Sequence, residues 1–340
     1  MTPPPESDEL VARAAALADE VLFPGAPAVD AAALVPVERL DALADAGLYG
    51  LLGPREVGGH AATPATFARV LEELARGCLT TAFVFAQHHG TVRTLASGPP
   101  ALAEAFLGPL CRGELRAGVA FSGLRRPGPP ALVAHAAPGG GYVLRGSASW
   151  VTGWGRVDLI HVAARRAGGD VVWALCDATE SASLRAEPLA LGAVAASGTV
   201  ALHFADTPVP PERVSAIEPF PAWQARDALG LRPNGAFALG CARRCGALAG
   251  DPASEAAAAS QRARLDAAGP EALPAERAAA CALAVTAAAR CVASTGGRAV
   301  LSGSHVERLW REAGFLLVFG QTPAIRAAEL AALPAPSGAR

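Results

Sequence analysis

The sequence has no lysine, and all 29 of its basic side chains are arginines. A catalytic mechanism that forms a Schiff base on lysine is therefore excluded. The formal net charge of −2 and the isoelectric point of about 6.4 provide no overall positive field, so we expect no nucleic-acid partner. Alanine, glycine and proline are abundant, which indicates codon bias and not a specialised function.

Cysteine is also scarce, with seven residues scattered along the chain. They form no Cys-x-x-Cys motif and no zinc-type spacing with histidine, so we expect neither a metal site nor a disulfide framework. The first residues are polar and acidic, unlike a signal peptide. No uninterrupted apolar run approaches the ~18 residues of a membrane helix. The sequence therefore predicts a cytoplasmic protein without a membrane span.

Hydrophobic periodicity changes twice along the chain. Residues 1–115 have helical spacing, with Thr63 as an N-cap before proline and Gly77 as a stop. Residues 116–215 contain short strand-like runs separated by Gly, Pro and Asp, and residues 216–340 return to Ala-rich helical patterns. We therefore predict an α+β protein with an N-terminal helical domain, a middle antiparallel β-barrel-like domain and a C-terminal domain of the four-helix-bundle type.

Six runs carry the strand prediction: GVAFS, ALVAHAA, YVLRGSASW, DLIHVAAR, VVWALCD and TVALHFAD. One of them continues in an unusual way. Trp150, Val151 and Thr152 end the strand that starts at Tyr142, and glycines at 153 and 155 follow directly. From these residues alone, a core Trp followed by a turn Thr is the favoured interpretation, and a strand end that faces a ligand is the alternative.

Three segments resemble the acyl-CoA dehydrogenase superfamily, in the order and spacing of that family. They are the helical stretch Leu43–Arg76 with its Pro-x-x-x-Gly-Gly turn, the stretch GGGYVLRGSASWVTG, and the strand with its Val-Pro exit at Ser197–Val214. The resemblance covers essentially the whole chain. It implies the family's helical, β and helical domains.

The resemblance also implies a flavin cofactor, normally FAD, with FMN or reduced flavin as alternatives. In that family the segment matching Trp150, Val151 and Thr152 lies along the flavin ring, where hydroxyl and backbone donors stabilise the charge that a flavin gains with hydride. Ser122 matches a hydroxyl of a second flavin segment, in which Gly123 replaces a glutamate. We therefore expect the cofactor to be bound by Ser122, Trp150, Val151 and Thr152.

The sequence departs from the family at the catalytic base. Phe319 aligns with the usual glutamate, and Leu231 occupies the alternative position before Arg232. Phenylalanine accepts no proton at any pH, so the usual base is missing. The family's Gln-x-x-Gly-Gly stretch for the nucleotide end of FAD survives only as Gly296 and Gly297, which we retain as cofactor candidates although two glycines also end a helix.

Few other groups are available for acid–base chemistry. His88 and His89 follow a strongly apolar helical stretch whose end comes near the substrate cavity in the family, and they are the catalytic candidates. A polar helix end explains them equally well. Asp227 lies four residues before Leu231 and is a weaker candidate.

Three functions remain open at this point. The first is a flavin-dependent oxidoreductase acting on a CH–CH bond of an acyl thioester, bound to CoA or to a carrier protein. The second is a flavin-dependent monooxygenase or oxidase on the same fold, and the third is a non-catalytic scaffold that has lost the cofactor. From the resemblance we also expect an electron-transfer or reductase partner, and assembly into a homodimer or homotetramer.

Overall fold

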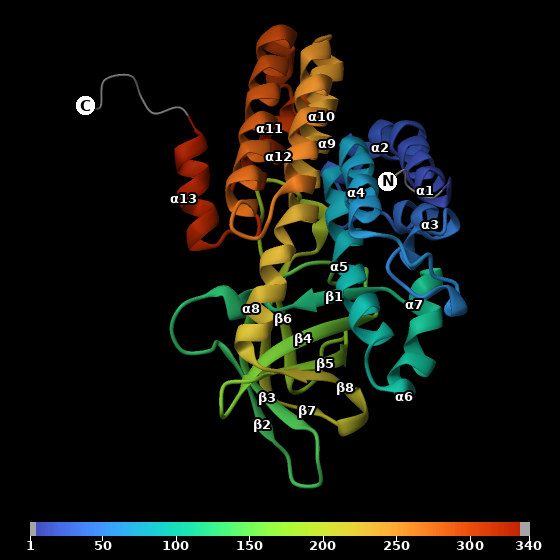
Figure 1. Cartoon of the computed structure of the whole chain (residues 1–340), viewed down its shortest axis with the longest axis vertical. Coiled ribbons are helices and arrows are strands. Elements are labelled where there is room, and N and C mark those ends of the chain that lie inside the picture. Colours follow the sequence, from blue (N-terminus) through green and yellow to red (C-terminus); the bar gives the residue numbers. More distant parts are fainter. Residues whose placement is uncertain (1–4, 334–340) are drawn as a thin grey trace, which may run out of the picture.

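The computed structural model describes residues 5–333 and contains three regions (Figure 1). The N-terminal region is helical and lies beside the upper half of the molecule, the sheet forms the lower half, and the C-terminal helices stand above it. The N-terminal helices are α1 (Pro5–Leu17), α2 (Phe23–Asp30), α3 (Val37–Asp45), α4 (Pro64–Gly77), α5 (Leu79–Ala96), α6 (Pro100–Leu102) and α7 (Gly108–Arg112).

The capping signals in the sequence operate as expected in α4. The Thr63 side chain accepts a hydrogen bond from the Thr66 N–H at 3.1 Å, proline follows at the first helical position, and the helix ends at Gly77. Helix α4 buries Phe67, Leu71 and the rest of its apolar stripe. Its opposite face carries the charges described below.

The middle region is a single eight-stranded sheet. Its strands are β1 (Ala117–Ala120), β2 (Leu132–Ala136), β3 (Tyr142–Val151), β4 (Leu159–Arg166), β5 (Val171–Asp177), β6 (Leu184–Pro188), β7 (Val200–Val209) and β8 (Val214–Glu218). The order across the sheet is β6-β7-β3-β2-β4-β5-β8, and β1 pairs with β4.

Two features of this sheet differ from the sequence prediction. The pairs β1–β4 and β2–β4 are parallel, so the sheet is mixed and not wholly antiparallel. The strands β6 and β8 were not predicted, because each has only five residues, only one of them fully buried, and carries little of the apolar alternation that marks a strand. Both lie at the ends of the strand order, where short edge strands are common.

The C-terminal helices are α8 (Phe220–Leu229), α9 (Leu231–Ala249), α10 (Pro252–Ala267), α11 (Leu273–Thr295), α12 (His305–Leu316) and α13 (Pro323–Ala332). Helix α11 packs along α9, α10, α12 and α13. The stretch Leu273–Val300 is long and apolar enough to cross a membrane by length and composition, but 39% of its most apolar window is buried inside the protein. Its contacts are those of a central bundle helix.

Helix α9 crosses α4 at very short range, and this crossing joins the C-terminal bundle to the N-terminal helices. A Cβ atom at Gly240 would lie 2.3 Å from the carbonyl oxygen of Glu72 and 2.8 Å from the Arg76 nitrogen. Only glycine has no atom at that point. The two backbones can approach this closely because residue 240 has no side chain.

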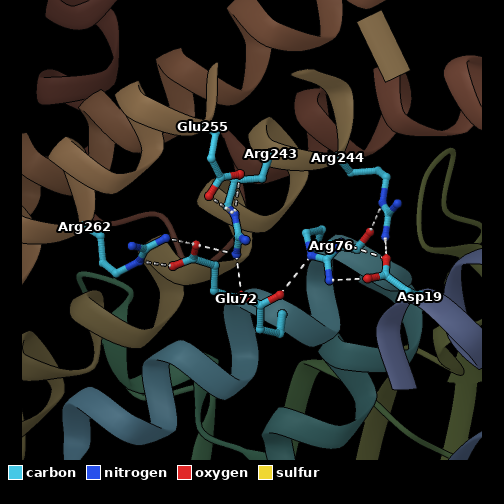
Figure 2. Close-up of polar contacts among 8 residues, drawn as sticks. Asp19, Glu72, Arg76, Arg243, Arg244, Glu255 and Arg262 are labelled. Carbon is cyan, nitrogen blue, oxygen red and sulfur yellow. Dashed lines mark hydrogen bonds and ion pairs between the residues drawn. The ribbon is translucent and has the colours of Figure 1, made fainter. Parts of the chain in front are cut away.

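Charged side chains surround the same crossing (Figure 2). The Glu72 carboxylate is only 2% exposed and accepts from Arg262 at 2.6 and 2.8 Å and from Arg243 at 3.0 Å. Arg243 also reaches Glu73 and Glu255 at 2.5 and 2.9 Å. A buried carboxylate of α4 is thus neutralised by cations from α9 and α10.

A second set of ion pairs extends the connection to the π-helical turn at Ala18–Leu22. Asp19 accepts from Arg76 at 2.7 and 2.9 Å and from Arg244 at 2.6 Å (Figure 2). Arg244 also donates to the Arg76 carbonyl at 2.8 Å. The hydrogen bonds from Arg76 lower the pKa of Asp19 and outweigh its partial burial, so this carboxylate is charged at neutral pH.

The Gly240→Ala substitution is predicted to destabilise the protein by about 1–3 kcal/mol, because the new methyl group overlaps the backbone of α4. Urea unfolding followed by circular dichroism measures the change. Gly314→Ala in α12 is the matched control: nothing lies within 4 Å of its Cβ position, and we expect no loss and up to about 1 kcal/mol of gain. Equal stability of Gly240→Ala and wild type would contradict the close crossing.

The Glu72→Gln substitution is predicted to cost about 1.5–3 kcal/mol, because two arginines then lose a charged acceptor in a buried place. The same unfolding experiment measures it. Glu9→Gln removes the carboxylate of an exposed pair with Arg13 on α1 and should cost about 0.5 kcal/mol or less. Similar losses of unfolding free energy in the two variants would mean that burial does not strengthen the contacts of Glu72.

Candidate functional site

A large cavity, which we call the outer cleft, has a volume of about 1110 Å³. It opens between the sheet, α5 and the segment that joins α12 to α13. Each side contributes lining residues. Helix α5 contributes Gln87, the segment after α12 contributes Phe319, and the sheet region contributes Ser122, Trp150 and Thr152.

Trp150 is the most unusual residue in the outer cleft. It has a φ of 62°, in the left-handed region that a bulky residue rarely adopts, and its side chain is 54% exposed. The register of β3 against β7 shifts between Ala148 and Val151, so the strand bulges at this position. The bulge turns a large aromatic ring out of the sheet into the cleft. Strain of this kind typically marks a functional residue.

Hydroxyl groups lie next to Trp150 in the same wall. The Thr152 Oγ1 is 3.0 Å from the Oγ1 of Thr199, which is 2.8 Å from the Oγ of Ser197. Thr152 is 2% exposed, and both threonines line the cleft. A chain of three hydroxyls fixes their positions and can direct an O–H into the cavity.

The two remaining predicted residues of this wall differ in their placement. Ser122 begins a 3₁₀ turn at Ser122–Arg125 and lines the outer cleft, and its hydroxyl donates to the Ser149 carbonyl. Val151 is completely buried in the core of the sheet and does not line the cleft. Any contact of Val151 with a cofactor would therefore come from its backbone.

Phe319 closes the inner end of the outer cleft. Its ring meets Phe83 edge-on at 5.0 Å, Phe315 in a stacked arrangement at 5.7 Å and Phe237 at 5.9 Å between centroids. No carboxylate, histidine, cysteine or tyrosine lines this cleft. The position that the sequence resemblance assigns to the base is thus part of an apolar aromatic wall.

His88 and His89 lie deeper than the outer cleft and are each 1% exposed. The Nδ1 of His88 accepts from the Ala117 N–H at 3.2 Å, and the Nε2 of His89 bonds the Leu48 carbonyl at 3.1 Å. Burial lowers the pKa of His89 to about 4 and also lowers the pKa of His88. Both rings are neutral at pH 7 and are held by backbone groups, as expected of structural histidines.

Gly296 and Gly297 follow the end of α11, and neither lines the outer cleft. The first turn of α11 approaches the cleft region, where Pro274 lines a neighbouring cavity. The 23 residues of α11 then extend about 33 Å away from it. The two glycines are thus separated from Trp150 and Thr152 within one chain.

Two smaller cavities adjoin the outer cleft. One, of about 220 Å³, lies between α4, α5, the sheet and α9, and we call it the inner cavity. The other, of about 530 Å³, lies between the β1–β2 connection and α8 and is the side cavity. Arg125 lines all three cavities. Its guanidinium donates twice to Asp227 at 2.7 Å, which connects the 3₁₀ turn to α8.

Asp227 is the only carboxylate that lines any of these three cavities. The sequence supports Asp227 only weakly and gives no signal for Arg125, because the two residues are 102 positions apart and no local motif links them. Gln87 was missed as well. It lies between the outer cleft and the inner cavity, and its amide donates to the Phe83 carbonyl at 2.9 Å.

Comparison with known proteins identifies the N-terminal region. Residues 4–114 match the family model "Acyl-CoA dehydrogenase, N-terminal domain". Cyclohex-1-ene-1-carbonyl-CoA dehydrogenase of Syntrophus aciditrophicus is 39% identical over 92 residues, which are 27% of this chain and 22% of that protein. Probable acyl-CoA dehydrogenase FadE25 of Mycobacterium tuberculosis is 28% identical over 220 residues, 62% of this chain and 56% of that protein. The chain thus matches well under two thirds of these relatives' lengths.

Solved structures share the fold over almost the whole chain. Butyryl-CoA dehydrogenase from Megasphaera elsdenii superimposes with a TM-score of 0.78 at 19% identity and covers 98% of both chains. The FAD complex of PigA gives a TM-score of 0.80 at 17% identity, covering 97% of this chain and 98% of the other. Residues 4–114 thus match an acyl-CoA dehydrogenase N-terminal domain, and the described chain shares its fold with acyl-CoA dehydrogenases of known structure.

Proposed function

We propose that the protein is a flavin-dependent oxidoreductase that acts on a CH–CH bond of an acyl thioester, with FAD as its cofactor. One observation carries the proposal. The outer cleft is open, with a volume of about 1110 Å³, and a strained, exposed Trp150 stands in it beside the hydroxyl chain of Thr152. Folding alone gives no reason to hold a Trp ring in that conformation.

The residues of the outer cleft fit a flat, polarisable ring. Trp150 offers an aromatic surface for stacking, and Thr152 offers a hydroxyl whose position Thr199 fixes. Phe315 and Phe319 add stacked apolar rings from the end of α12 and the segment after it. A bound flavin supplies the hydride acceptor. Ser122 retains lone pairs for a donor on the ligand, since its own proton goes to the Ser149 carbonyl.

Oxidation of a CH–CH bond next to a thioester also requires a group that takes the α-proton. Phe319 cannot do so, and the neutral His88 and His89 are bound to backbone groups. Asp227 is the remaining carboxylate at the cavities: it lines the inner and side cavities and is held there by Arg125, which also lines the outer cleft. We therefore propose that the Asp227 carboxylate accepts the α-proton, in place of the family's usual glutamate.

A flavin-dependent monooxygenase or oxidase is the second candidate. The observation that favours it is the lining of the outer cleft, which contains no carboxylate, histidine, cysteine or tyrosine. Oxygen chemistry on a flavin needs no protein carboxylate at the substrate. Anaerobic loss of yellow colour on adding an acyl-CoA supports the dehydrogenase, whereas oxygen consumption with a reductase supports the monooxygenase. The open cleft counts against a scaffold without cofactor.

The partners follow from the same proposal. The relatives act, by their names, on acyl-CoA thioesters, so we propose such a thioester or its carrier-protein equivalent as substrate. Reoxidation then requires an electron-transfer or reductase partner.

Large apolar residues are exposed at Val300, Leu301 and Trp310, which supports a homodimer or homotetramer. In such an assembly Gly296 and Gly297 would meet the flavin of a neighbouring copy. A cytoplasmic location is retained as a prediction.

The double substitution Trp150→Ala with Thr152→Ala is predicted to raise the dissociation constant for FAD at least tenfold, because it removes an aromatic surface and a hydrogen bond. Titration of the apoprotein, followed by visible absorbance and flavin fluorescence, measures it. Trp310→Ala is the control, since Trp310 is similarly exposed but does not line the outer cleft. With far-UV circular dichroism preserved, an unaltered FAD titration of the double variant would refute the site.

Asp227→Asn is predicted to slow anaerobic flavin reduction by an acyl-CoA at least 100-fold, because an amide cannot take the α-proton. Arg125→Gln breaks the same ion pair but keeps the carboxylate, so its rate should stay within tenfold of wild type. Stopped-flow absorbance gives both rates, and FAD titration checks that the cofactor still binds. Equal losses in the two variants would show that the pair is structural and that Asp227 is not the base.

A further inference from the structure

The inner cavity gathers a large share of the protein's aromatic side chains. The whole sequence has five tryptophans, two tyrosines and eleven phenylalanines. Six of these residues line this one cavity: Phe67, Phe121, Trp173, Trp223, Phe237 and Phe319. They come from all three regions of the fold, so packing within one region does not explain why they meet.

The size of the inner cavity restricts what it can hold. Its volume is about 220 Å³, below the ~300–1,000 Å³ of sites for drug-sized ligands. An apolar cavity of about 150 Å³ is enough for benzene. The space therefore suits one six-membered ring with a short linker. A long alkyl chain would exceed it.

Most charged or titratable residues of the cavity are paired or neutral, and Arg93 is the exception. Burial lowers the pKa of His161 to about 3, and its Nε2 bonds the Ser215 hydroxyl at 2.7 Å. His161 packs on Trp173 with 4.6 Å between ring centroids, so it extends the aromatic wall as a neutral ring. Arg226 is ion-paired with Glu218, as Asp227 is with Arg125, and Arg93 lies at an exposed position.

The inner cavity adjoins the outer cleft. Gln87, Phe121 and Phe319 line both, so only these side chains stand between the two spaces. Phe319, at the position expected for the base, is thus a movable side chain at this boundary and not part of the backbone. A substrate whose reacting carbons lie in the outer cleft can extend its distal end past Phe319 and Gln87 into the aromatic space.

We propose that the inner cavity binds a flat six-membered ring at the distal end of the substrate, so that the protein acts on short acyl groups ending in an aryl ring. This rests on the proposed function for the reacting part of the substrate. The recognition itself depends only on the cavity. Stacked and edge-to-face contacts with the six aromatic residues favour a flat ring over a flexible chain of similar size.

Gly90 of α5 provides a way to fill the inner cavity without disturbing the backbone. It lines the cavity, and a Cβ atom there would meet only Val119, at an ordinary contact distance of 3.8 Å. The Gly90→Leu substitution therefore adds a side chain to empty space. Gly90→Ala is the matched control, because its methyl group fits and leaves most of the volume open.

The test uses benzyl alcohol and 1-hexanol as probes of the wild-type chain and both variants. Binding is followed by the fluorescence of Trp173 and Trp223, which line the cavity and are 8% and 4% exposed. We expect benzyl alcohol to bind wild type at least threefold more tightly than 1-hexanol. We expect Gly90→Leu to raise the dissociation constant of benzyl alcohol at least tenfold. Gly90→Ala should raise it less than threefold.

Equal binding of the two probes to wild type would overturn the proposal without reference to any variant. Unchanged binding of benzyl alcohol by a folded Gly90→Leu would overturn it as well. FAD titration of the same samples separates the two ideas. If FAD binds and the ring does not, the ring site fails alone, and if the ring binds but FAD does not, the proposed function fails while the ring site stands.

Discussion

The close crossing of α4 and α9 is the constraint on which the rest of the structure depends. Glycine at 240 lets the two backbones touch, and the buried Glu72 carboxylate then receives arginines from α9 and α10. A charged group with so little exposure is tolerable only with its partners in place. The crossing thus permits one relative position of the N-terminal helices and the C-terminal bundle, and the cavities lie between them.

The cavities follow from this arrangement because each is bounded by elements from more than one region. Helix α5 supplies Gln87 and Gly90, the sheet supplies Phe121, and α9 supplies Phe237 to the inner cavity. The outer cleft likewise combines the bulge at Trp150 with the turn after α12. A change in the angle between α4 and α9 would therefore alter the shape of the site without touching any residue in it.

The outer cleft combines the aromatic and hydroxyl groups that we propose for the cofactor with an apolar side that we propose for the substrate. Thr152 and Ser122 are still present beside the exposed Trp150. Across the cleft, the glutamate has given way to Phe319, which extends an aromatic surface into the inner cavity. Phenylalanine at this position provides no proton acceptor and contributes one of the six aromatic rings of the inner cavity.

The sequence by itself determined the order of helices, strands and helices, the cap at Thr63 and the wall of Trp150 and Thr152, because hydrophobic period, capping and strand-end motifs are local. It missed β6 and β8, which are short edge strands, and the parallel pairs of β4, which join distant segments. Only the tertiary structure buried Val151, separated Gly296 and Gly297 from the cleft, and joined Arg125 to Asp227 across 102 residues. Those outcomes depend on which surfaces pack together, and no local pattern encodes that.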